Sequence, residues 1–189
     1  MKKASLKLLS VLVILPVFFQ NCDKKEEEGS KYVGNYVITE ALVAETFTIP
    51  VTGAGNIPVI ANTSVTQAIQ TALLSAVTCS SPDKSYIELR KDYSLYLSCE
   101  GANAINGGTW AEASATEIQL NLNSTAVPTS ASGIALSVTD VKVIGNILSG
   151  KATIPLPKEF LAPLLAPFIL DPSAPAVYLV KISLKFTQK

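Results

Sequence analysis

The clearest hydrophobic pattern in the chain is a strict alternation near its C-terminus. Between residues 177 and 186, Val180, Ile182, Leu184 and Phe186 are each separated by a lysine or a serine. An apolar period of two predicts a β-strand with one face buried and the other in water.

The same period of two recurs in shorter runs along the chain. Residues 85–90 and 94–99 flank a Lys-Asp-Tyr turn and predict an antiparallel hairpin. Gly53 and Gly55 mark another turn. The remaining expected strands are residues 31–39, 45–51, 117–122, 134–138 and 141–147, with Thr139-Asp140 separating the last two. The pattern therefore predicts a mainly β, antiparallel domain.

One stretch, about residues 64–77, has a helical period instead. Ser64 followed three residues later by Gln67 forms a capping box. Val65, Ile69 and Leu73 then fall on one face, so the stretch predicts an amphipathic helix. We expect this face to pack on the sheet, with docking of a partner as the alternative.

A second irregular stretch covers about residues 158–170. Its eleven residues from Phe160 to Leu170 carry no polar side chain, and Pro163 and Pro167 lie among them. Each proline removes a helical hydrogen bond and disfavours helix before it, which predicts a short kinked helix or two single turns. The stretch either plugs one end of the domain or presents an apolar docking patch.

The first 22 residues combine a basic start, an apolar run from Leu8 to Phe19 and a cysteine, Cys22. This order resembles the lipobox of bacterial lipoproteins, with Phe19 and Asn21 in the relaxed form seen in spirochaetes and other non-enteric Gram-negative bacteria. The resemblance implies a signal peptide over residues 1–21, cleavage by signal peptidase II and acylation of Cys22. The alternative is a plain secretory leader, or an uncleaved anchor, that happens to contain a cysteine. A lipid on Cys22 would anchor the chain to a membrane of the cell envelope, and we expect the outer membrane.

Residues 22–30 are charged and contain no apolar side chain after the cysteine, so we expect a solvated, flexible tether. Lys25, Glu26 and Glu27 resemble the surface-export signal of Bacteroidetes lipoproteins. Asp23 resembles an inner-membrane retention signal instead. The two resemblances conflict, so the periplasmic and surface faces both stay open. Residues 31–189 are then the β domain.

Composition narrows the chemistry of that domain. The 15 basic and 15 acidic residues cancel, but loss of the three leader lysines leaves a net charge of −3. Residues 31–189 hold 10 basic and 11 acidic residues, so no basic surface for nucleic acid is expected. Histidine is absent, which removes the commonest general base and transition-metal ligand. We expect no cofactor, no metal and no enzymatic activity.

Two cysteines remain once Cys22 is assigned to lipid. In an exported, oxidising setting Cys79 and Cys99 are expected to form a disulfide bond. The alternative is a pair of buried free thiols.

Three short motifs resemble the lipocalin-like domains of many bacterial lipoproteins: residues 33–36 (Val-Gly-Asn-Tyr), the Lys91-Asp92 hairpin, and residues 108–110 (Gly-Thr-Trp). The resemblance covers roughly residues 31–122. Tyr36 replaces the tryptophan that the family favours, and the helix interrupts the expected meander. It implies an antiparallel barrel or half-barrel, in which we expect Trp110 to be a core aromatic. The expected function is binding of a small apolar ligand or of a surface or host partner, with a structural envelope component, or an enzyme of unrecognised type, as alternatives.

Overall fold

The computed structural model describes residues 29–74, 76–77, 79, 81, 84–100, 102–123 and 133–189. The predicted signal peptide, Cys22 and most of the predicted tether lie outside these residues. The elements are β1 (Gly34–Val43), β2 (Phe47–Val51), β3 (Gly55–Val59), α1 (Thr66–Leu74), β4 (Ser85–Leu89), β5 (Ser94–Cys99), β6 (Ile105–Ser114), β7 (Glu117–Leu122), β8 (Ile134–Ile144), β9 (Ile147–Pro157), α2 (Lys158–Leu161), the 3₁₀ helix η2 (Ala162–Leu165) and β10 (Val177–Gln188).

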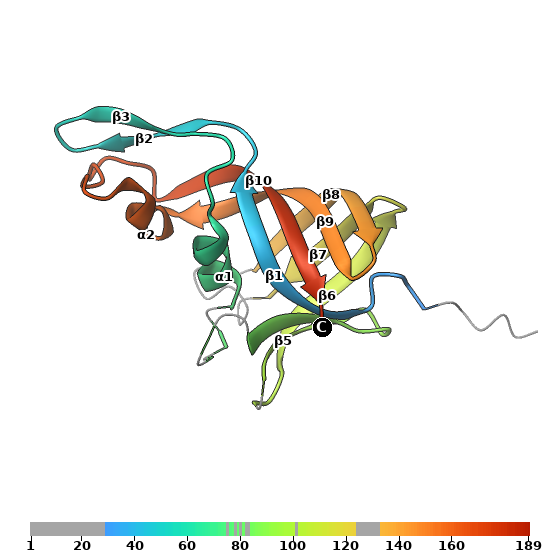
Figure 1. Ribbon diagram of the computed structural model, residues 1–189. Helices are drawn as coiled ribbons and strands as arrows, with labels where there is room; N and C mark the ends of the chain where they lie inside the picture. Colours follow the sequence, from blue (N-terminus) through green and yellow to red (C-terminus); the bar gives the residue numbers. More distant parts are fainter. Residues whose placement is uncertain are drawn as a thin grey trace, which may run out of the picture.

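Eight of these strands form a closed antiparallel barrel (Figure 1). Strands β4 to β10 each pair with the next in sequence, and β1 closes the barrel between β10 and β4. The predicted lipocalin-like, antiparallel β-barrel is confirmed. Its inward positions are apolar, as the alternation predicts: Val180, Ile182, Leu184 and Phe186 are all buried on β10.

The barrel closes through a short seam between β1 and β4, where only Gly34, Asn35 and Tyr36 have partners. Beyond Tyr36 the free edge of β1 is covered by α1. The Gln70 side chain donates to the Ile38 carbonyl at 2.9 Å, and the Ala41 N–H donates to the Thr66 hydroxyl at 2.9 Å. The helix that interrupts the meander therefore completes the barrel, because it satisfies a strand edge that would otherwise be open.

The predicted capping box at Ser64 is wrong. The helix begins at Thr66, and Ser64 instead forms an antiparallel bridge with Leu42. The backbone of Ser64 is engaged by β1 and cannot serve as the start of the helix. Val65 and Ile69, however, are fully buried, which confirms that the apolar face packs on the barrel.

Residues 134–147 do not form two strands separated by Thr139-Asp140. Strand β8 continues through this point with a β-bulge, in which Asp140 adopts φ 54° and the pairing shifts between Thr139 and Lys142. Aspartate tolerates this left-handed conformation better than most residues. The chain reverses at Gly145-Asn146 instead.

Strand β9 was not predicted at all. Two of its inward positions are occupied by Gly150 and Ala152, which weaken the hydrophobic alternation. The glycine is required by packing, because a Cβ at residue 150 would lie 2.6 Å from Val138 Cγ1.

The predicted hairpin and disulfide are both present. Ile87 faces Leu97 and Leu89 faces Leu95 across the β4–β5 pair. Cys79 and Cys99 are bonded, with their Cα atoms 5.6 Å apart and a sequence separation of 20. Closing a loop of this length stabilises the fold by about 3 kcal/mol in the chain-entropy model.

The two ends of the barrel differ in construction (Figure 1). At the proximal end the described chain begins and ends, together with the turns at residues 115–116 and 145–146. At the distal end the β2–β3 hairpin, α2 and η2 project past the barrel. These distal segments hold each other: Val51 bridges Leu170, and the Thr52 N–H donates to the Ile169 carbonyl at 2.8 Å.

Candidate functional site

Among the described residues, the inside of the barrel, the first place to seek a ligand site, is occupied mainly by apolar side chains. Ile105, Ile134 and Tyr178 are partly buried, but most inward side chains of the barrel strands are almost completely buried. Those with at most 2% of their surface exposed include Ile38, Leu95, Leu97, Trp110, Ile118, Ile154, Leu156, Val180 and Ile182. Because protein interiors are close-packed, we expect little room for a small molecule between these side chains.

Trp110 closes the proximal end of this core. It is 1% exposed, and its indole N–H donates to the Arg90 carbonyl at 2.9 Å. The Tyr93 ring, which is half exposed, lies over it with 5.2 Å between ring centroids. The expectation that Trp110 is a core aromatic is confirmed.

The proximal turn beside Trp110 is ordered by charged groups. Arg90 makes a two-point contact with Glu88, at 2.8 and 2.9 Å, and its guanidinium lies 3.6 Å from the centre of the Tyr96 ring. The hydrogen bond from Arg90 to Glu88 raises the pKa of the guanidinium. Asp92 accepts from the Ser94 hydroxyl and N–H, which lowers the pKa of its carboxyl. These groups satisfy one another, as expected of a structural turn.

Three further glutamates of the barrel strands and their turns lie in separate settings. Glu117 accepts from the Ser137 hydroxyl, while Glu100 and Glu112 are exposed. Within the described ranges no group of three or more Cys, Asp or Glu side chains is placed to hold a metal ion.

The outer wall over β1, β8, β9 and β10 is polar and shallowly hollowed. Two adjoining depressions are lined by serines, threonines and three exposed ion pairs. The pairs are Glu40–Lys185 at 2.7 Å, Glu45–Lys181 at 2.9 Å and Asp140–Lys151 at 3.0 Å. Exposed pairs of this kind contribute little to stability.

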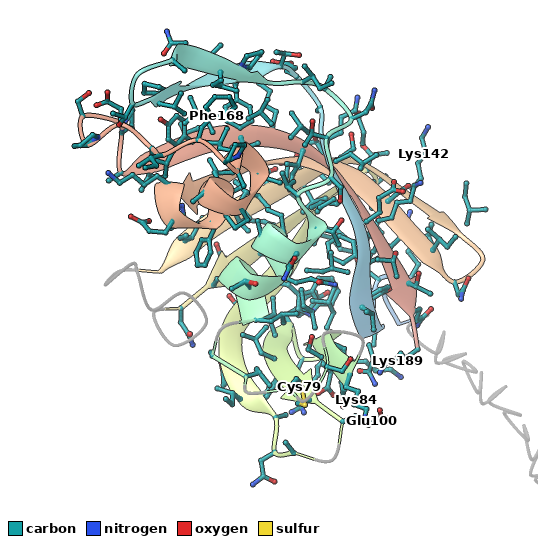
Figure 2. The ribbon with its side chains drawn as sticks, turned by 60° about the vertical axis from the view of Figure 1, so that its left-hand side comes forward. Cys79, Lys84, Glu100, Lys142, Phe168 and Lys189 are labelled. Atoms are coloured by element: carbon teal, nitrogen blue, oxygen red, sulfur yellow. A yellow bond between two sulfur atoms is a disulfide. The ribbon has the colours of Figure 1, made fainter. Side chains whose placement is uncertain are left out.

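The apolar stretch at the distal end has two different sides. Leu161 and Leu165 are buried, and the stretch forms α2 and η2 as two short turns, as predicted. On its other side Phe168 is 45% and Ile169 73% exposed. Figure 2 shows Phe168 beside the β2–β3 hairpin. The stretch is therefore both a plug and an exposed apolar patch, where the sequence left the two as alternatives.

More exposed apolar side chains lie on the outer side of β10 at the same end. Val177 is 49% and Leu179 74% exposed, although the next outward position, Lys181, is charged. We call the exposed side chains of the stretch and the strand start the distal face: Leu164, Phe168, Ile169, Val177 and Leu179. Burial raises the pKa of the neighbouring Tyr178, whose hydroxyl has no hydrogen-bond partner among the described residues.

Sequence reasoning missed a third exposed apolar group, at the tip of the β8–β9 hairpin. Ile144 is 73%, Ile147 42% and Val143 37% exposed. The signal was present as a Gly-Asn pair between two isoleucines, which is a hairpin turn signal.

Comparisons with protein-family models, with curated proteins and with solved structures found no match for this chain. Among the described helices, none has the length and apolar character needed to cross a membrane.

Proposed function

We propose that this chain is a non-enzymatic binding module that a lipid on Cys22 holds at the outer membrane of a bacterial cell. The observation that carries the proposal is the combination of closely buried side chains in the described part of the barrel with several exposed apolar side chains at its distal end. Since closely buried side chains occupy the described part of the interior, recognition takes place on the outside of the barrel. A protein partner fits this surface better than the small apolar ligand that the sequence left equally open.

The lipid anchor is supported by the sequence at the start of the chain. The apolar run from Leu8 to Phe19 is shorter than the roughly 20 residues that a spanning helix requires. It therefore fits a leader that is removed, and Cys22 follows at the position of the acylated cysteine. One acyl chain binds membranes only marginally, whereas the several chains of a lipoprotein hold a domain stably.

The distal face supports a protein partner. Several large apolar side chains exposed at one end of a domain are a common mark of an interaction site. Phe168 and Ile169 are held by backbone bonds on both sides, from the Phe168 N–H to the Leu165 carbonyl and from the Thr52 N–H to the Ile169 carbonyl. The face is thus largely preformed, which lowers the entropic cost of binding.

Site-specific photo-cross-linking tests this assignment. A photoreactive amino acid replaces Ile169 in the full chain displayed on cells, and a matched control carries it at Gln119, an exposed position on the outer wall of β7. We expect a discrete cross-linked product at residue 169 and none at residue 119. A product of twice the chain's mass would instead assign the face to self-assembly, and no product at residue 169 would contradict the proposal.

A further inference from the structure

The tip of the β8–β9 hairpin, residues 143–147, is apolar where the outer wall behind it is polar. Ile144 pairs with Ile147 across a two-residue loop, and Gly145 at φ 61° supplies the sharp reversal. Farther along the same strands the outward positions are Lys142, Ser149 and Lys151. The exposed isoleucine pair is therefore confined to the tip.

This tip lies at the end of the barrel from which the chain leads back to Cys22. A run of hydrogen bonds joins the two: the Gln188 N–H donates to the Asn146 carbonyl at 2.7 Å, the Gln188 side chain to the Val33 carbonyl at 3.4 Å, and the Val33 N–H to the Ser30 carbonyl at 3.0 Å. Figure 1 shows the hairpin turn, the C-terminus and the start of the described chain on the same side of the molecule. The distal face lies at the other end.

The length of chain between Cys22 and the barrel fixes how far this end can stand from the bilayer. Six residues lie between Cys22 and Gly29, which makes seven Cα-to-Cα steps. Even fully extended they span at most about 25 Å. A lipid on Cys22 therefore keeps the proximal end close to the membrane. The effective concentration of the membrane at this end is then so high that even a weak second contact forms.

We propose that the β8–β9 tip inserts Ile144 and Ile147 into the interfacial region of the lipid bilayer as a second, shallow contact. The inference rests on the proposed lipidation of Cys22. The second contact gives the domain a defined orientation, with the distal face directed away from the membrane and accessible to a partner.

The charges at this end favour apolar insertion over ionic attraction. Lys142 and Lys189, both labelled in Figure 2, are exposed there, but so are Asp92 and Glu112. Lys31 and Lys91 add two exposed cations, of which the Lys31 Nζ already donates to the Ala115 carbonyl at 3.2 Å. The small net positive charge of this mixed surface is screened by salt, whereas apolar insertion is not, so the contact is expected to change little with salt.

A fluorescent probe on the tip tests the inference in the lipidated full chain. Ile144→Cys is labelled with nitrobenzoxadiazole and the protein is reconstituted into phosphatidylethanolamine–phosphatidylglycerol vesicles. Ile169→Cys is the matched control, because both isoleucines are 73% exposed but lie at opposite ends. Cys79 and Cys99 are bonded to each other and do not compete for label. We expect a blue shift, and quenching by acyl-chain-linked quenchers, at residue 144 only, at low and high salt alike.

Two readouts separate this inference from the anchor on which it rests. Vesicle flotation reports the anchor: failure of the chain to float would contradict both the lipid anchor and the tip insertion. A chain that floats while residue 144 matches residue 169 overturns the tip insertion alone. In the labelled chain, Ile147→Asp is expected to abolish the quenching at residue 144, whereas Val177→Asp on the distal face, at similar exposure, leaves it unchanged.

Discussion

Cys22→Ala is expected to move this protein from the membrane fraction to the soluble fraction. The substitution removes the thiol that would carry the acyl chains, and the hairpin tip alone offers only two isoleucine side chains. Apolar burial on that scale gives weak, reversible binding, so nearly all attachment depends on the cysteine. Fractionation of cells, together with incorporation of labelled palmitate, measures the effect.

An uncleaved leader would obscure this result, so the variant is best expressed behind an ordinary cleavable secretory leader. The control is the unaltered chain, with its native leader and Cys22. If the alanine variant stays in the membrane fraction after its leader has been removed, the lipid anchor is not what holds the chain. That outcome would also remove the basis for orienting the barrel at the membrane.

Trp110→Ala is expected to lower the free energy of unfolding by about 3–5 kcal/mol. The ring is 1% exposed and closes the proximal end of the core, so its removal leaves a large cavity. The Arg90 carbonyl keeps one partner, the Tyr93 N–H at 3.0 Å, so most of the loss comes from packing. Against a typical total of 5–15 kcal/mol this is a severe loss. Urea-induced unfolding followed by circular dichroism measures it.

Two comparison variants make that measurement specific. Trp110→Phe keeps much of the ring volume and should cost clearly less than the alanine variant. Phe168→Ala removes a half-exposed aromatic at the distal end and should change stability far less. If Trp110→Ala and Phe168→Ala lose the same stability, Trp110 is not the core residue described here.

Where large apolar side chains alternate with polar ones, the sequence alone was sufficient to predict the strand. Strands β4, β5, β7 and β10 alternate cleanly, because large apolar side chains occupy most of their inward positions. The disulfide followed from the exported setting and the even count that remains without Cys22. Trp110 was assigned to the core through the resemblance to lipocalin-like domains, and it is buried.

Other features depend on contacts that no local pattern records. Gly150 and Ala152 make β9 look weakly hydrophobic, yet small residues are needed where β8 bulges against it. The start of α1 is set by Ala41 and Leu42 on β1, which are more than 20 residues earlier in the chain. Local capping signals were overridden by this tertiary pairing.

The exposed surfaces were the least predictable part. Phe168 and Leu161 belong to one apolar stretch, but only the folded chain shows which of them is buried against the distal segments. The isoleucines of the hairpin tip looked like strand interior until the reversal at Gly145 placed them beyond the barrel. Exposure of an apolar residue depends on where its strand ends, and strand ends are what sequence patterns fix least well.

Native mass spectrometry of the protein purified from membranes tests the central claim most directly. The claim is that the barrel is filled and that binding takes place on its outer surface. We predict that the mass of the chain under native conditions equals its mass after denaturation, with the lipid on Cys22 as the only addition to the polypeptide. A small molecule that accompanies the native chain in equal amount, and that also stays with the Cys22→Ala variant, would place a ligand inside the barrel and contradict the account.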